Sequence, residues 1–147
     1  MFKKILLPID GSENSKKATN YVLELSKKFN SKVYVLNSYE MPAIAMAPPA
    51  GAVSHYRLNA EIEQNLKEYS QKILNECAKI FKDNNIDVET IMLKGEPGPK
   101  IVETAEQYNC DLVVIGNRGL GSVKSILLGS VSNYVVHHIK FPILLIH

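Results

Sequence analysis

The sequence has 147 residues, of which 46% are hydrophobic and 22% are charged, a balance typical of globular proteins and not of disordered ones. Its 17 Lys and Arg residues are interleaved with 15 Asp and Glu residues, so the chain lacks the basic patch of a nucleic-acid-binding protein. A chain of this length predicts one domain, residues 1–147, with a full hydrophobic core.

Cysteine usage and the first residues bear on the cellular compartment. Cys77 and Cys110 are too few for a disulfide framework or a metal cage, and we interpret them as buried thiols. The start is not a signal peptide, because its apolar run is short and soon meets Pro8 and Asp10. No apolar stretch reaches the length of a membrane span. We therefore expect a cytoplasmic protein without a membrane partner.

The first half of the chain predicts two strands and two helices. An apolar run at residues 5–9 is typical of a buried strand, and Ser12 is the candidate N-cap of a helix that ends near Phe29. Residues 33–36 predict a second strand, and residues 57–84 predict a long helix. The apolar stripe of the long helix is expected at Ile62, Leu66, Tyr69, Ile73, Cys77 and Ile80.

The second half continues the alternation of strands and helices. Residues 86–90 alternate between apolar and polar side chains, which predicts a half-exposed strand at a sheet edge. A short helix follows Pro99, and residues 111–115 are the clearest buried strand. After a glycine-rich segment we expect a helix near residues 130–139 and a last strand at 143–146.

This order of elements predicts an α/β fold: an open, twisted, five-stranded parallel sheet of the Rossmann-like type with helices on both faces. Two strand ends carry unusual residues, Asp10-Gly11 after the first strand and Gly116-Asn117 after the fourth. If both build one site, the first and fourth strands are neighbours and the strand order is 3-2-1-4-5. Pro8 does not suit a central strand, so we expect strand pairing to end there and the site to begin.

Residues 41–54 form an uncharged segment that contains three prolines and is long for a loop inside a compact domain. Three interpretations remain open for it. It is a surface excursion, a lid over a ligand, or a contact for a partner.

The segment GNRGLGSVKSILLGSVS, residues 116–132, predicts a phosphate site. Glycine allows positive φ angles and lets an anion approach the backbone without a Cβ in the way. A helix that begins near Ser130 points its unpaired N–H groups and its positive dipole end at the same place. Ser130 and Ser132 add hydroxyl groups. Together these features predict a cradle for a di- or triphosphate.

Two better-known phosphate loops do not match this segment. A P-loop needs Gly-Lys-Ser/Thr after its first glycine and four residues, but Gly121 is followed by Ser122, and Lys124 is preceded by Val123. The dinucleotide fingerprint fails because Gly119-x-Gly121-x-x ends on Lys124. Glycines alone also suit a flexible connection, so the motif needs further support.

That support is a resemblance to a known family. The spacing Gly116-x2-Gly119-x9-Gly129-Ser130 is similar to the motif of the ATP-binding branch of the universal stress proteins. The resemblance covers the whole chain. It includes four further segments, at residues 8–12, 95–97, 127–131 and 142–146.

The resemblance implies an adenine nucleotide in the crevice between the first and fourth strands, and a homodimer. Gly116, Gly119, Gly129 and Ser130 would hold phosphate and ribose, while Asp10 and Ser38 would lie by the adenine. The full set that we assign to the nucleotide site is Pro8, Asp10, Ser38, Gly116, Asn117, Arg118, Gly119, Gly121, Gly129, Ser130, Val131 and Ser132. Ser38 stands where the family often has an apolar residue, and Asn117 where serine is common.

Several side chains keep two interpretations. Asp10 contacts adenine or a metal, or it caps the next helix; Arg118 pairs with a phosphate or is solvated. Lys124 meets the terminal phosphate or is simply exposed. His137 and His138 suit the negative end of a helix dipole better than metal ligation. We expect no protein metal site, and Mg²⁺ would bridge the phosphates of ATP through water ligands.

These observations predict an ATP-binding regulatory module of the stress response with an unidentified protein partner. A slow ATPase or phosphotransferase and a nucleotide-independent dimeric scaffold are the alternatives. We expect the homodimer to form through Ile143–Ile146, because an uncovered apolar edge strand promotes association.

Overall fold

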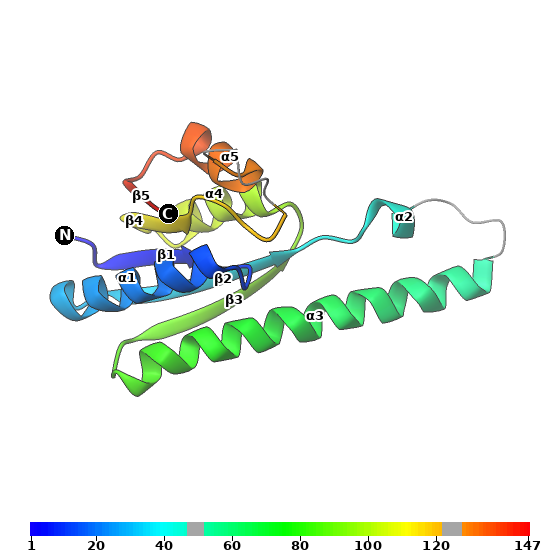
Figure 1. Ribbon diagram of the computed structural model, residues 1–147, viewed down its shortest axis with the longest axis horizontal. Coiled ribbons are helices and arrows are strands. Elements are labelled where there is room, and N and C mark those ends of the chain that lie inside the picture. Colours follow the sequence, from blue (N-terminus) through cyan, green and yellow to red (C-terminus); the bar gives the residue numbers. More distant parts are fainter. Residues whose placement is uncertain (47–51, 122–127) are drawn as a thin grey trace.

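The computed structural model describes residues 1–46, 52–121 and 128–147. Its sheet has five parallel strands in the order β3-β2-β1-β4-β5, which confirms the predicted fold (Figure 1). The strands are β1 (Lys4–Pro8), β2 (Lys32–Tyr39), β3 (Val88–Lys94), β4 (Leu112–Gly116) and β5 (Ile143–Ile146).

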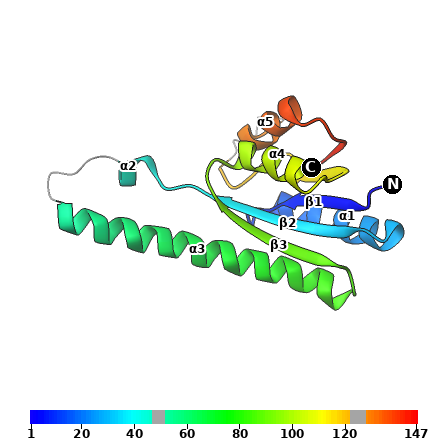
Figure 2. The same cartoon turned by 180° about the vertical axis from the view of Figure 1, so that it is seen from behind.

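Helices cover both faces of the sheet, as Figures 1 and 2 show. Helices α1 (Glu13–Phe29) and α3 (Ala52–Asp83) pack on one face, where Val22 and Phe81 join Ile5 and Leu7 in a buried cluster. Helices α4 (Pro97–Gln107) and α5 (Ser130–His138) pack on the other face, around Leu6. A short helix, α2 (Ala43–Met46), precedes α3. Successive residues of β1 therefore serve opposite core layers, as the alternation of a strand requires.

The ends of α1 follow from local sequence chemistry. The Ser12 hydroxyl accepts a hydrogen bond from the N–H of Ser15 at 3.2 Å, so Ser12 is the N-cap that the sequence predicts. At the other end Asn30 adopts a left-handed conformation with φ of 52°, which stops the helix. The capped start of α1 places Ser12 and Ser15 directly beyond the carboxyl end of β1.

The two neighbours of β1 separate from it at different points. Pairing with β2 continues to Pro8, opposite Leu36, whereas pairing with β4 ends at Leu6, opposite Val113. Pro8 has no N–H to donate, so it suits a position where the ladder on one side has already ended. Pairing thus ends at Pro8 on the β2 side, as predicted, but two residues earlier on the β4 side, where a crevice opens between β1 and β4.

The predicted stripe of α3 is partly wrong. Tyr69 and Ile80 are 46% and 39% exposed, although the prediction placed them in the core. Among residues 56–83 of α3, the buried ones are Ser70, Ile73, Leu74, Cys77, Ala78 and Phe81. Their spacing of three, one, three, one and three residues tracks one face of the helix, and the buried stripe includes a serine that apolar periodicity could not identify.

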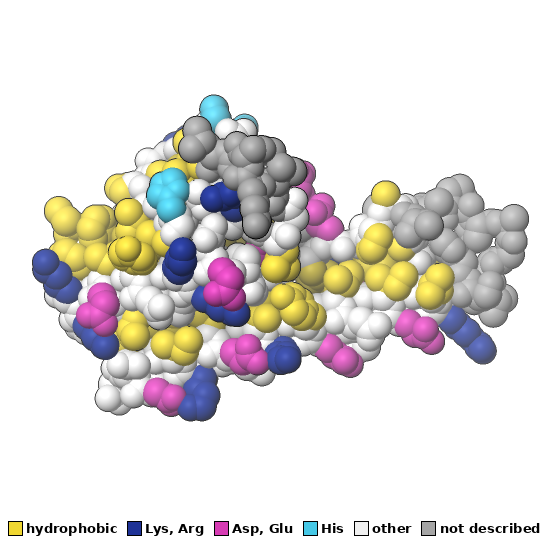
Figure 3. Space-filling model, in the orientation of Figure 1, with side chains coloured by type: hydrophobic (Ala, Val, Ile, Leu, Met, Phe, Trp, Pro, Cys, Tyr) yellow, Lys and Arg dark blue, Asp and Glu magenta, His cyan; other side chains and the backbone are white. Residues whose placement is uncertain are grey.

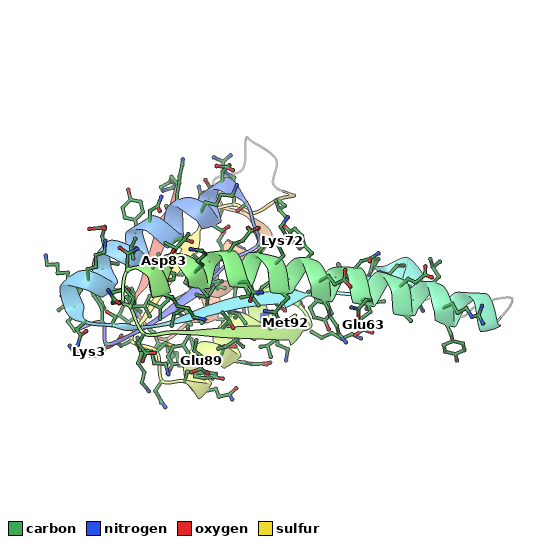
Figure 4. All side chains as sticks on the ribbon, turned by 90° about the horizontal axis from the view of Figure 1, so that it is seen from below. Lys3, Glu63, Lys72, Asp83, Glu89 and Met92 are labelled. Carbon is green, nitrogen blue, oxygen red and sulfur yellow. The ribbon has the colours of Figure 1, made fainter. Side chains whose placement is uncertain are left out.

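Strands β2 and β3 are longer than predicted. Strand β2 continues to Tyr39, and β3 begins at Val88 and ends at Lys94, because the two strands stay paired from Val33–Val88 to Tyr39–Lys94. Beyond this point α3 extends past the sheet, and Figure 4 shows Glu63 on that projecting part. The Lys94 ammonium lies 2.9 Å from the Glu63 carboxylate and ties the end of β3 to it.

Part of the uncharged segment forms α2, while residues 47–51 lie outside the described residues, so its three interpretations remain predictions. No described helix is both long and apolar enough to cross a membrane. Basic and acidic side chains are interspersed on the face that Figure 3 shows, without a basic stripe among the described residues drawn there.

The two cysteines are both buried, as the sequence analysis expected. Cys77 belongs to the cluster under α1 and α3, and Cys110 to the cluster under α4 and α5, on opposite faces of the sheet. Burial raises the pKa of each thiol to about 11. Both thiols therefore stay protonated and unreactive at neutral pH.

Candidate functional site

A cavity of about 440 Å³ lies at the carboxyl ends of β1, β2 and β4. This is where open α/β sheets bind ligands, and the volume is typical of small-molecule sites. Every predicted site residue except Asn117 lines it. Aliphatic side chains, including Leu36, Ile101 and Ile115, form part of its wall.

Asp10 connects the two strand ends that border the cavity. Its Oδ1 accepts a hydrogen bond from the N–H of Ser12 at 2.9 Å, and its Oδ2 accepts one from the N–H of Leu120 at 3.2 Å. The carboxylate thus supports the turn before α1, but the N-cap itself is Ser12, and the adenine and metal interpretations of Asp10 stay predictions. The carboxylate also holds the glycine-rich loop, which the sequence analysis did not anticipate.

Gly116 and Gly119 are needed for space, and none of the described motif glycines has a positive φ, so that part of the prediction is wrong. A Cβ on Gly116 would lie 2.8 Å from the Cβ of Asn14, and a Cβ on Gly119 would collide with Oδ2 of Asp10. Gly129 has an ordinary φ of −70°. The described glycines with positive φ are Gly11 and Gly95, which lie outside the motif.

The N-terminus of α5 faces the cavity. Its N-cap is Gly129, and the first hydrogen bond of the helix runs from the N–H of Asn133 to the carbonyl of Gly129 at 2.9 Å. The N–H groups of Ser130, Val131 and Ser132 precede this bond, and these three residues line the cavity. The first turn carries no acidic side chain. The positive end of the helix dipole is therefore available to an anion.

Ser130 and Ser132 differ from each other more than the sequence suggests. Ser130 is exposed at the start of α5. Ser132 is buried, and its hydroxyl lies 2.6 Å from the Asn117 carbonyl and 3.0 Å from the Gly129 carbonyl. Because the hydroxyl donates its proton within the loop, Ser132 shapes the cradle in addition to lining it.

Asn117 is the one predicted residue that the structure places away from the cavity. Its side chain is 2% exposed and bonds to the amide of Asn14 and to the ring of His147, each at 2.8 Å. Asn117 therefore does not line this cavity, and its assignment to the nucleotide site stays a prediction. Its backbone follows Gly116 directly, but its side chain enters the packing between α1 and β5.

Comparison with known proteins settles the family. The model of the universal stress protein family matches residues 1–147. The chain belongs to this family. It is 32% identical over 146 residues to universal stress protein MJ0531 of Methanocaldococcus jannaschii, covering 99% of this chain and 82% of that protein. It is 30% identical over 149 residues to YxiE of Bacillus subtilis, covering 99% of both.

Solved structures agree with this assignment. The structure of hypothetical protein MJ0577 superposes with a TM-score of 0.88 at 27% identity, over 99% of this chain and 96% of that one. A universal stress protein in complex with cAMP superposes with a TM-score of 0.69 at 26% identity, over 99% and 97% of the two chains. Nucleotide binding therefore occurs among the structural relatives of this universal stress protein.

The predicted cations have different outcomes. Arg118 lines the cavity of this universal stress protein, and its choice between phosphate and solvent stays a prediction. Lys124 lies outside the described residues. His137 and His138 occupy the last turn of α5, where each Nδ1 donates to the carbonyl four residues earlier. The described residues contain no group of three His, Cys, Asp or Glu side chains that could hold a metal.

The sequence analysis missed residues on the β2 side of the cavity. The buried Asn37 donates to the carbonyl of Ile9 at 2.7 Å and accepts a hydrogen bond from the Ser70 hydroxyl at 2.6 Å. Its neighbour Ser38 donates to the carbonyl of Gly95 at 2.6 Å. The other cavity residues that were not predicted are Ile9, Ser12, Ser15, Leu36, Pro97, Ile101, Ile115, Leu120 and Leu128. Two polar residues at the end of an apolar strand were the available signal for Asn37.

Proposed function

We propose that this universal stress protein binds an adenine nucleotide, ATP, in the cavity between β1 and β4, and that occupancy regulates its contact with a partner protein. The observation that carries the proposal is the N-terminus of α5, whose first N–H groups and unneutralised dipole face the cavity. An anionic group such as a phosphate is the ligand that this arrangement favours.

The rest of the cavity suits the remainder of a nucleotide. Gly129 allows phosphate oxygens close to the backbone, and Arg118 supplies positive charge. The aliphatic wall at Leu36 and Ile115 suits the flat, weakly polar faces of a base. The relative that is in complex with cAMP supports an adenine nucleotide as the ligand class.

We expect slow hydrolysis at most. Asp10 is the one acidic side chain among the described residues that line the cavity, and both of its oxygens accept N–H groups of the protein. Phosphoryl transfer to water needs a positioned nucleophile and usually acids that hold a metal. Mg²⁺ would therefore arrive with the phosphates and keep mostly water ligands. This chemistry suits a switch that holds its nucleotide.

We also propose a homodimer through β5. This strand is an edge of the sheet, and Ile143, Leu144 and Leu145 are only half-buried. A two-fold pairing of β5 with its copy would cover the edge. Leu144→Lys is expected to give monomer or aggregate by light scattering, with Val136→Lys on α5 as the control. A wild-type monomer at tens of micromolar would refute the dimer.

The test of nucleotide binding has two steps. Mass spectrometry of ligand released from gently purified protein should identify an adenine nucleotide, and calorimetry should give tighter binding of ATP than of GTP. Absence of binding by ATP, ADP, AMP and cAMP would refute the proposal. Steady hydrolysis near 1 s⁻¹ or above, the range of about 1–10³ s⁻¹ of ordinary enzymes, would identify an enzyme instead.

A further inference from the structure

The main chain of Asn117 fixes both ends of the glycine-rich loop. Its N–H donates to the carbonyl of Ile146 in β5 at 2.8 Å. Its carbonyl accepts the N–H of Gly129 at 2.7 Å and the hydroxyl of Ser132 at 2.6 Å. Gly129 is the N-cap of α5 and Ser132 lies in its first turn. The position of Asn117 therefore sets where the first N–H groups of α5 point.

The side chain of Asn117 is held from two sides with a defined direction. Its Oδ1 accepts from the Asn14 amide, so its Nδ2 faces the Nδ1 of His147. An amide N–H can only donate, and the ring must therefore accept at Nδ1, which requires a neutral imidazole with its proton on Nε2. Asn117 is 2% exposed, whereas His147 is exposed, so its ring can exchange protons with the solvent.

We infer that Asn117 and His147 form a positioning pair for the anion-binding end of α5, and that protonation of His147 weakens nucleotide binding by disrupting the pair. The inference rests on the proposed function of the cavity. Neither side chain lines the cavity, so the effect acts through the loop and not through contact with the ligand.

Protonation removes the acceptor that Asn117 uses. Imidazolium carries a proton on both nitrogens, so Nδ1–H would face the N–H groups of Asn117. The hydrogen bonds can form again only if the side-chain amides of Asn117 and Asn14 both rotate by half a turn, which exchanges the positions of their oxygen and nitrogen atoms. Histidine is the side chain whose charge ordinarily changes between pH 5 and 8, so a pH series across this range tests the pair.

The charges near His147 come from α1 and from the loop. Lys17 donates to the main-chain oxygen of His147 at 3.3 Å. Glu13 and Lys16, on the same helix, pair with each other at 2.8 Å. Arg118 follows Asn117 in the loop. A pH profile must therefore be assigned with variants that remove only the titration of the ring.

The main experiment is calorimetry with ATP between pH 5.5 and 8.0 at constant ionic strength. His147→Asn keeps an acceptor at the place of Nδ1 without a titrating group, and His147→Leu removes the acceptor. From pH 8.0 to 5.5 the wild type should lose roughly two- to tenfold more affinity than His147→Asn, as expected for one hydrogen bond. His147→Leu should be weakened by a similar factor at every pH. His137→Asn is the matched control and should keep the wild-type profile.

A second measurement does not need the nucleotide. In the ligand-free protein the NMR signal of the Gly129 amide should shift with the same midpoint as the His147 ring, and should not do so in His147→Asn. Asn117→Asp should reverse the preference, because a carboxylate accepts from Asn14 and from a protonated ring alike.

The outcomes separate the two proposals. A protein that binds no nucleotide but whose Gly129 amide follows His147 would refute the proposed function and support the positioning pair. Equal pH profiles of the wild type and His147→Asn, or a Gly129 amide that ignores the His147 titration, would overturn the inference.

Discussion

The two sides of the cavity are built on different principles. On the side of β4 and α5, the protein offers main-chain N–H groups at Ser130 and Val131. On the side of β1 and β2, side chains are bonded to the protein itself, as Asn37 is to Ile9 and Ser70. The first side offers hydrogen-bond donors to a ligand, whereas the second side maintains the shape of the cavity.

This difference shows that a residue can line the cavity without recognising the ligand. Ser38 lines the cavity, yet its hydroxyl donates to the Gly95 carbonyl and joins β2 to the loop after β3. We therefore expect substitutions on the α5 side to change binding at little cost in stability. Substitutions on the β2 side should do the opposite.

The largest effect is expected for Gly129→Asp. Residue 129 is an N-cap with φ of −70° and ψ of 164°, a conformation in which Asp is among the preferred caps, so the fold should be retained. The new carboxylate would occupy the anion site and repel phosphate, which should weaken ATP binding by at least about 100-fold in calorimetry. Gly129→Asn, of the same size but uncharged, should lose less. Equal losses in both variants would show that size, and not charge, decides.

The next effect is expected for Asn37→Ala. The substitution leaves the carbonyl of Ile9 and the hydroxyl of Ser70 without their partner inside the protein. Each buried polar group left unpaired costs about 1–3 kcal/mol of unfolding free energy. Urea unfolding measures the loss, and ATP affinity should change far less than in Gly129→Asp.

A double-mutant cycle with Ser70→Ala isolates the bond between the two side chains. The second substitution should cost less in the Asn37→Ala background than in the wild type, because its partner is already missing. Additive losses would mean that the contact contributes nothing. A loss of binding as large as that of Gly129→Asp would end the distinction between the two sides.

The same contrast explains what the sequence could predict. The fold follows from the alternation of apolar strands and amphipathic helices, and the α5 side follows from the spacing of Gly116, Gly119 and Gly129, because both are local patterns. Asn37 and Ser70 are 33 positions apart, and only the packing of α3 on β2 makes them partners. Such a pair leaves no local signal.

Asn117 shows the converse limit. Its position inside the motif suggests contact with the ligand, but Asn14 and His147, which bind it, come from α1 and from the end of β5. The reason for Gly119 was equally hidden, since the atom that excludes a Cβ belongs to Asp10. Motif spacing indicates that residues act together, and tertiary packing decides how.

A smaller effect is expected for Ser38→Ala. It removes one hydrogen bond, to the carbonyl of Gly95, at a half-buried position. Such a bond contributes about 0.5–1.5 kcal/mol to stability. Thermal unfolding should show a small decrease, with Glu76→Ala, at an exposed position of α3, as the control. A loss of ATP affinity without a loss of stability would show that Ser38 recognises the ligand and does not only maintain the shape of the cavity.

The smallest effect is a pH dependence of the free energy of unfolding. It comes from the two thiols in the core layers that support both sides of the cavity, and it is absent at neutral pH. Burial raises the pKa of Cys77 and Cys110 to about 11, above the roughly 8.5 of a free thiol. Between these values the unfolded chain has lost protons that the folded protein retains, so the free energy of unfolding falls as pH rises from about 8.5 to about 11. Below about pH 8.5 both states hold the protons and the dependence disappears. Tyr34, whose pKa burial also raises, acts in the same direction, so the cysteines must be removed to separate their contribution from that of Tyr34.

Denaturant titrations of Cys77→Ala and Cys110→Ala should give a lower free energy of unfolding at pH 7, which then falls less steeply than in the wild type above about pH 8.5. One thiol lies on each face of the sheet, so the two variants should reduce the slope of the unfolding free energy against pH by similar amounts. A change in only one of them would show that the two core layers unfold separately.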